Sequence, residues 1–390
     1  MNRGKLTKGA LMGVYEKLGV RPVIHGAGTT TRYGGSIMRP ETIEVMREAA
    51  QSLVNIDELN EAAGAAIARI LGAPAALVTA GSTAGLVLQA AACMTGDDPA
   101  KITRLPDTTG MRREFVIQRA HRFSYDQAYR VPGGVLVEIG LGRRTALFEL
   151  ESAITERTAG VVHLVSPFTS PPGVLSFEEV REVAHARDVP VLVDAASMLP
   201  PRDNLFRYLR GGADLVIFSG GKGIRGPQST GILAGRRDLV RAATLNASPN
   251  QAIGRAAKTS KEEIVGIVNA LELFLAEDEA AEMTRYRDVC ASIVDTLRDI
   301  QGLRALVEQD CVNRVIPHAV VYFEPSWKGP SGKAVRLALA SGEPHIYVQQ
   351  GALQGGYADE ISVDPINLQP GDEKIVATRL REELMQRRTA

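Results

Sequence analysis

The chain has 390 residues, and its 45 lysines and arginines are balanced by 45 aspartates and glutamates, which gives a formal net charge of zero. This balance argues against a general electrostatic surface for nucleic acid or an anionic membrane, and the length predicts one large domain plus a smaller one. With no apolar run of transmembrane length, no signal-peptide pattern and only three widely spaced cysteines, the sequence favours a cytoplasmic protein with no membrane partner, no nucleic-acid partner and no cysteine metal site.

The first 40 residues are rich in glycine and threonine, as in the stretch Gly26–Thr31. Residues 1–40 are therefore expected to form an irregular N-terminal arm, which is either disordered or laid over a site.

Between residues 41 and 258, short apolar runs alternate with helical patterns. Near-continuous apolar character is typical of strands buried on both faces, and strand–helix alternation predicts a large α/β domain with a mostly parallel seven-stranded sheet. The loop between the last two runs has no room for a helix, which allows one of them to be antiparallel. The expected strands are 75–79, 115–118, 135–139, 161–165, 190–194, 215–218 and 231–234, and the expected helices are 82–94, 147–156, 177–187 and 203–210.

Residues 259–390 have a different pattern. An amphipathic helical stretch from Ser260 to about Asp299 is expected to link two domains. Strands are then predicted at 319–323, 345–348 and 360–363, with helices near 333–340 and 371–387. This segment is predicted to be the linking helix and a small α+β C-terminal domain.

A lysine stands in a glycine-rich turn between two apolar strands, in the order Ser219-Gly220-Gly221-Lys222. A lysine held there is costly unless it is paired or chemically used, and a Schiff base with a carbonyl compound is the functional interpretation. The alternative is a surface turn with a solvated lysine. On this stretch alone, the two interpretations have similar weight.

Three further features follow predicted strands, at the edge where open α/β sheets bind ligands. Gly81, Ser82 and Thr83 open a helix whose N–H groups and dipole suit a phosphate, although Ser82 could be an ordinary helix cap. Asp194 ends an apolar strand and needs a partner such as a protonated ring nitrogen, or it caps a turn. His121 could stack on a flat cofactor or transfer protons, or it could be a structural histidine.

The order of these features is more informative than any one of them. A phosphate site, a histidine, a strand-end aspartate and a lysine turn follow one another along one predicted sheet. Pyridoxal 5'-phosphate needs such a set: a phosphate site, a partner for the ring face, an anion at the pyridine nitrogen and a lysine.

At this point the chain resembles the fold-type I, class V-like pyridoxal-phosphate enzymes. Within them it is similar to the selenocysteine synthase (SelA)-like group that includes D-glucosaminate-6-phosphate ammonia-lyase. The resemblance runs from about residue 20 to 235 and is carried by the stretches 21–38, 81–85, 118–121, 193–197 and 219–228.

The resemblance implies a role for each matching residue. Lys222 would form the Schiff base and act as acid and base, Asp194 would pair with the pyridine nitrogen, and His121 would stack on the ring. Ser197 would contact the ring oxygen, and the arm with Thr29 and Thr30 would approach the substrate, in an enzyme that works as a homodimer. The phosphate would be held by Gly81, Ser82, Thr83 and Ser219.

Two departures concern the substrate. Relatives often carry arginines where this chain has Gln349-Gln350 and Asp364-Pro-Ile-Asn-Leu368, so the usual anchor for an anionic substrate is in doubt. The candidates to grip a carboxylate or phosphate are Arg32, Arg39 and Arg225, of which Arg225 is three residues from Lys222.

The function expected is that of a lyase, which eliminates a β-substituent and releases ammonia from a small amino acid or amino sugar acid. The same cofactor supports racemisation and aldol cleavage, so a racemase or aldolase is the enzymatic alternative. The alternative from another class is a non-catalytic binding protein that keeps the cofactor fold.

Overall fold

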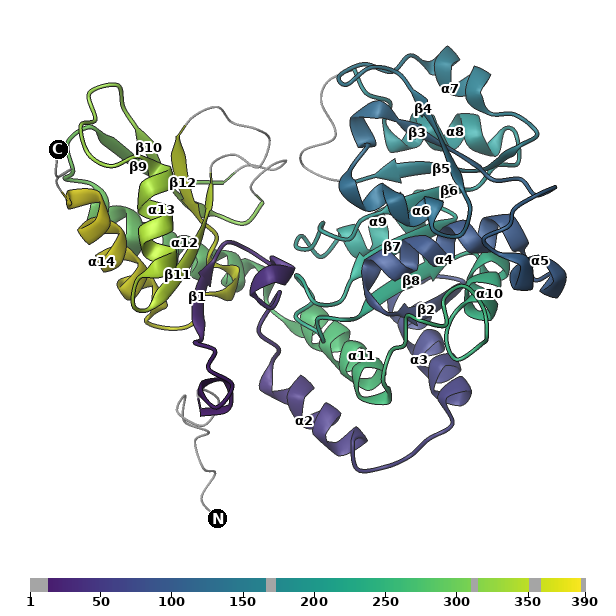
Figure 1. Ribbon diagram of the computed structural model, residues 1–390, viewed down its shortest axis with the longest axis horizontal. Coiled ribbons are helices and arrows are strands. Elements are labelled where there is room, and N and C mark those ends of the chain that lie inside the picture. The colour runs from purple at the N-terminus through teal and green to yellow at the C-terminus, as the bar shows by residue number, and fades with distance from the viewer. Residues whose placement is uncertain (1–12, 166–172, 310–314, 351–358, 387–390) are drawn as a thin grey trace. The chain divides into compact units, whose positions relative to one another are not determined.

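The computed structural model describes residues 13–165, 173–309, 315–350 and 359–386 (Figure 1). Its contacts divide the chain into two compact units. The large unit is formed by residues 36–277, and the small unit by the described residues up to Gly35 together with those from Asp278 onward. Within the ranges just given, every helix is too short or too polar to cross a bilayer.

The large unit contains a seven-stranded sheet in the order β2-β8-β7-β6-β5-β3-β4. Only β8 runs against its neighbours β2 and β7, and the other pairs are parallel, which confirms the predicted mostly parallel sheet and its antiparallel exception. The strands are β2 (Ala75–Thr79), β3 (Glu114–Gln118), β4 (Val135–Ile139), β5 (Thr158–Leu164), β6 (Val191–Asp194), β7 (Leu215–Ser219) and β8 (Gly231–Gly235).

Helices cover both faces of this sheet (Figure 1). Along β7, Leu215 and Ile217 pack into one core, whereas Val216 and Phe218 pack into the other, because successive strand side chains point to opposite faces. This explains why the strands are apolar at nearly every position. One face is covered by α3 (Ile56–Leu71), α7 (Leu147–Ala153), α8 (Phe177–His185), α9 (Asn204–Arg210) and α11 (Lys261–Ala276), and the other by α4 (Gly81–Thr95), α6 (Gln127–Arg130) and α10 (Arg237–Asn246).

The small unit is an α+β structure around a five-stranded sheet in the order β1-β11-β12-β10-β9. Helices α12 (Glu279–Leu297), α13 (Gly332–Ser341) and α14 (Asp372–Met385) supply much of its apolar core. The strands are β1 (Val23–Gly26), β9 (Leu303–Glu308), β10 (His318–Phe323), β11 (His345–Gln350) and β12 (Glu360–Val363).

The N-terminal segment is more ordered than the sequence suggested. Strand β1 pairs in parallel with β11, and the following turn is fixed by Asn367, whose side chain donates to the carbonyl oxygens of Gly28 and Gly35 at 2.7 and 2.8 Å. The contacts therefore group the start of the arm with the C-terminal residues and leave α11 in the large unit, whereas the sequence placed boundaries at 40 and 258.

Candidate functional site

The C-terminal strand ends of the large unit meet at one edge of its sheet. Leu164 of β5 lies opposite Asp194 of β6, which in turn lies opposite Ile217 of β7. Ser219 of β7 lies opposite Gly231 of β8, and Thr79 of β2 lies opposite the same glycine. Open α/β sheets bind ligands at such an edge.

Lys222 lies three residues after the end of β7 and is partly buried. Its Nζ donates to Ser197 Oγ at 2.5 Å, and its backbone carbonyl accepts from Ser36 Oγ at 2.8 Å. Burial lowers the pKa of Lys222, while the nearby charge of Asp194 acts in the opposite direction. The lowered pKa raises the share of the neutral amine, which is the nucleophilic form.

The turn around Lys222 requires glycine at several positions. A Cβ added at Gly220 would lie 2.1 Å from Thr230 Oγ1, and one added at Gly221 would lie 2.5 Å from Gln228 Cα. At Gly223 it would lie 2.2 Å from the carbonyl oxygen of Leu199. Close backbone packing therefore fixes the path of the turn on both sides of Lys222.

We expect Gly221→Ala to lower the free energy of unfolding by about 1–3 kcal/mol, because the new methyl group has no space against the Gln228 backbone. Urea denaturation would measure the change. Gly142→Ala is the control, since a Cβ there meets no heavy atom within 4 Å. Equal stability of the two variants would contradict the tight packing of this turn.

Asp194 ends β6 and is half-buried. Burial raises its pKa, whereas the Ala196 backbone N–H, which donates to Oδ1 at 3.1 Å, and the charge of Lys222 lower it. A half-buried carboxylate of this kind is stabilised by a cationic partner. The site thus combines a half-buried anion with an amine whose pKa is lowered.

His121 is buried in the 3-10 turn η2 (Arg119–His121) that follows β3. The backbone N–H of Leu164 donates to its Nδ1 at 3.3 Å, so the neutral ring carries its proton on Nε2. The ring of His163 meets it in a T-shaped contact with centroids 4.6 Å apart.

Helix α4 begins at Gly81, whose backbone φ of 76° favours glycine. Ala80 precedes the helix and provides no side-chain cap, and no acidic residue lies in the first turn. The first N–H groups of a helix of this length suit an anion, and the hydroxyls of Ser82, Thr83 and Ser219 lie on the same segment or the neighbouring strand end. A Cβ at Gly231 would lie 2.7 Å from the Gly81 carbonyl carbon, so the strand and the helix start approach closely.

These residues fit pyridoxal phosphate by the chemistry of their groups. An uncapped helix start suits its phosphate, a half-buried carboxylate suits its ring nitrogen, and a lysine with a lowered pKa suits its aldehyde.

The candidate substrate arginines differ in their surroundings. Arg39 is buried: its Nε donates to Glu277 Oε1 at 2.7 Å, and its Nη1 donates to the Ile224 carbonyl at 2.8 Å. Arg225 Nε donates to the Ile37 carbonyl at 3.1 Å. Together with the Ser36 contact, residues 36–39 therefore clamp the turn that carries Lys222. These two arginines support the turn.

Arg39→Met should destabilise the protein by about 2–3 kcal/mol, because it leaves the Glu277 carboxylate and the Ile224 carbonyl without a buried charged donor. Arg47→Met, in the helix α2 (Pro40–Ala49) that follows Arg39, is the control, since its pair with Glu44 is exposed to solvent and contributes little. Denaturation midpoints of the two variants would show the difference. If both variants lost equally little stability, the clamp would have no structural importance.

Thr29, Thr30 and Arg32 lie in the small unit. Thr30 Oγ1 donates to the Ala27 carbonyl at 3.0 Å, and Arg32 is exposed in η1 (Thr31–Tyr33). Thr29, Thr30 and Arg32 therefore belong to another compact body than the remaining candidates. Those remaining candidates lie at or after the strand ends along one edge of the large sheet, namely Gly81, Ser82, Thr83, His121, Asp194, Ser197, Ser219 and Lys222.

Sequence reasoning missed Ser36 and His163. Ser36 contacts the Lys222 carbonyl from 186 positions away, and His163 lies within an apolar strand run. Neither has a local pattern that indicates its contacts, although a histidine inside a buried strand is itself an unusual choice.

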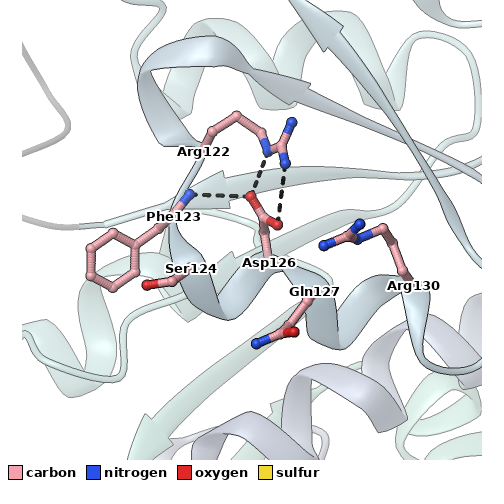
Figure 2. Close-up of a pocket in the computed structure, with 6 residues that line it drawn as sticks. All are labelled: Arg122, Phe123, Ser124, Asp126, Gln127 and Arg130. Atoms are coloured by element: carbon pink, nitrogen blue, oxygen red, sulfur yellow. Dashed lines mark hydrogen bonds and ion pairs between the residues drawn. The ribbon is translucent and has the colours of Figure 1, made fainter.

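The residues just after His121 line an open pocket of about 520 Å³, which is shown in Figure 2. Asp126 accepts from Arg122 Nε at 2.5 Å and from the Phe123 N–H at 3.2 Å, while Arg122 also pairs with Glu138 of β4. This network ties the segment after His121 to the sheet edge. The pocket is lined by residues that include no candidate cofactor residue, namely Arg122, Phe123, Ser124, Asp126, Gln127 and Arg130.

Burial, together with the neighbouring His121, lowers the pKa of His163 well below its usual value of 6.5. The unfolded chain therefore binds a proton at higher pH than the folded one, and the stability associated with this group is present above pH 6.5 and lost as the pH falls through the folded pKa. We expect urea midpoints to decrease on acidification below pH 6.5, with a shallower slope in His163→Phe. If the urea midpoints of His163→Phe and wild type changed equally with pH, the pKa of His163 would not be lowered by folding.

Comparisons with known proteins extend this description. A solved alanine–glyoxylate aminotransferase from Nostoc has the same fold, with a TM-score of 0.58 at 18% identity over 93% of this chain and 95% of that one. The structure of a D-glucosaminate-6-phosphate ammonia-lyase matches with a TM-score of 0.84 at 32% identity, over 95% of this chain and 98% of that one. The fold is that of the fold-type I pyridoxal-phosphate enzymes.

The sequence comparisons identify the family. The family model described as SelA, L-seryl-tRNA selenium transferase, matches residues 23–299. A D-glucosaminate-6-phosphate ammonia lyase from Salmonella typhimurium is 33% identical over 95% of this chain and 97% of that protein. A 5'-C-glycyluridine monooxygenase-decarboxylase from a Streptomyces species is 32% identical over 95% of this chain and 92% of that protein. The chain belongs to the SelA family.

Proposed function

We propose that this enzyme is a pyridoxal-phosphate-dependent lyase of the ammonia-lyase type, which acts on a small amino acid or amino sugar acid. The observation that carries the proposal is the placement of Lys222, whose pKa is lowered by burial, and the half-buried Asp194 at the same sheet edge, where the charge of each acts on the pKa of the other. Similarity over nearly the full length to a protein named D-glucosaminate-6-phosphate ammonia lyase supports the reaction type.

The chain's own residues would divide the work as follows. Lys222 would hold the cofactor covalently, Asp194 would keep a proton on its ring nitrogen, and His121 would cover one ring face. Ser197 would contact the ring oxygen. The helix start at Gly81, Ser82 and Thr83, together with Ser219, would bind the phosphate. When bound, the cofactor stabilises negative charge at the carbon that carries the substrate amine.

Lys222 would also be the acid–base group. Burial lowers the pKa of its free amine below the usual lysine value, so the amine would accept the proton from the substrate carbon. Its hydrogen bond to Ser197 Oγ defines where the amine lies in the cofactor-free protein. Thr29, Thr30 and Arg32 remain candidates for substrate contact from the small unit. Arg39 and Arg225 are candidates only if the substrate displaces a structural contact.

The test is a combined assay of the cofactor-loaded enzyme with D-glucosaminate 6-phosphate, D-glucosaminate and a panel of amino acids. Ammonia, keto acid, carbon dioxide and optical purity would be followed together. Equal amounts of ammonia and keto acid are expected. Carbon dioxide is included because a relative of similar identity is named a decarboxylase. Loss of optical purity without ammonia would instead support a racemase, and an aldehyde product would support an aldolase.

The homodimer and the cytoplasmic location are also part of the proposal. Light scattering would test the dimer, which should have twice the 41.8 kDa mass of the chain. Absence of any reaction by a protein that retains the cofactor would support a binding role.

A further inference from the structure

Two consecutive residues of β5 contact the ring of His121. Leu164 donates its backbone N–H to Nδ1 at 3.3 Å, and the ring of His163 meets that of His121 at an interplanar angle of 88°. The first contact selects the tautomer of His121, and the second restricts the rotation of its ring.

His163 lies in a buried cluster of aromatic rings. The residue is 6% exposed, and among the described residues its Nδ1 has no hydrogen-bond partner. On another side, Phe177 packs against it with centroids 5.7 Å apart, and Tyr208 packs against Phe177. The feature of His163 that contacts His121 is therefore its flat ring, which a phenylalanine would also supply, without the cost of a buried, unpaired nitrogen.

We propose that His163 is a positioning residue for His121. Its ring holds the plane of His121, so that the neutral ring, with its proton on Nε2, faces the cofactor in one orientation. His163 touches neither substrate nor cofactor in this role. The proposal rests on the proposed function only for the role of His121, since the orientation and tautomer of that ring can be measured without turnover.

The test compares His163→Phe, His163→Leu and Phe177→Leu, with the histidine ring nitrogens observed by NMR and cofactor affinity measured by titration. His163→Phe keeps an aromatic ring, so we expect the same His121 tautomer, nearly unchanged affinity and equal or higher thermal stability. His163→Leu removes the ring contact, so the His121 ring can rotate away from the Leu164 N–H that selects its tautomer. We therefore expect mixed tautomers and cofactor affinity about 3- to 10-fold weaker, the range that one aromatic pair supports. Phe177→Leu lies one ring further away and should leave the His121 signals unchanged.

Other outcomes would overturn the proposal. If Phe177→Leu altered the His121 signals as much as His163→Leu, His163 would be ordinary packing. If His163→Phe lost the tautomer, the ring shape would not be what positions His121. In an His121→Ala background, His163→Leu should cost no further cofactor affinity, and an additive loss would refute the coupling.

These measurements separate the two hypotheses. If the ammonia assay failed while the NMR and affinity results held, the reaction would be wrong and the positioning role would remain. If ammonia were released but His163→Leu left the His121 NMR signals unchanged, only the positioning role of His163 would be rejected.

Discussion

Lys222→Ala is expected to abolish covalent attachment of pyridoxal phosphate and to lower activity by about 10³–10⁴-fold, since it removes both the attachment point and the proposed base. The fold should survive. The contacts that hold the turn use the Lys222 carbonyl, the Ile224 carbonyl and the neighbouring glycines, and none needs the lysine amine. The substitution therefore removes the chemistry and leaves the backbone support intact.

Borohydride reduction followed by mass spectrometry would measure the attachment. Lys261→Ala is the matched control, because Lys261 is also a partly buried lysine of the large unit and donates to the Ala49 carbonyl at 2.7 Å. It should retain a reducible chromophore on Lys222 and nearly full activity. If Lys222→Ala kept the same reducible chromophore, the covalent role of Lys222 would be excluded.

The strands and helices of the large unit could be predicted from sequence because each is indicated by a short stretch of neighbouring residues. Each strand buried on both faces is a short apolar run, and each helix follows within a few residues. The short link between β7 and β8 was enough to indicate the antiparallel pair. By contrast, β1 was missed, since it pairs with β11 more than 300 residues later and its four residues have no strong pattern of their own.

Some residues of the candidate site could likewise be predicted from local sequence, whereas the surroundings of others could not. Asp194 and Lys222 could be found from sequence, because a strand end places each of them at the sheet edge. The environment of Arg39 could not be predicted from sequence, since its partner Glu277 is 238 positions away and the buried surroundings arise only on folding. A reactive arginine and a structural one look alike in sequence, and only their partners distinguish them.

Asp194→Asn should lower activity by about 10²–10³-fold while the protein stays folded. Asparagine has nearly the same shape and can still accept from the Ala196 N–H, but it carries no charge to hold a proton on the cofactor ring. Steady-state rates of the cofactor-loaded variant would measure the loss. Asp203→Asn, at an exposed position, is the control and should be near wild type.

The same variant gives an opposite expectation for stability. Because burial raises the pKa of Asp194, the charged form is disfavoured in the folded, cofactor-free protein, and its cost increases as the pH rises from the unfolded value through the folded pKa. Cofactor-free Asp194→Asn should therefore be at least as stable as wild type at neutral pH. If the carboxylate only capped the turn, asparagine would replace it with little change in stability or activity, because it can still accept from the Ala196 N–H. Higher stability combined with lost activity is the pattern of a half-buried charge kept for its chemistry.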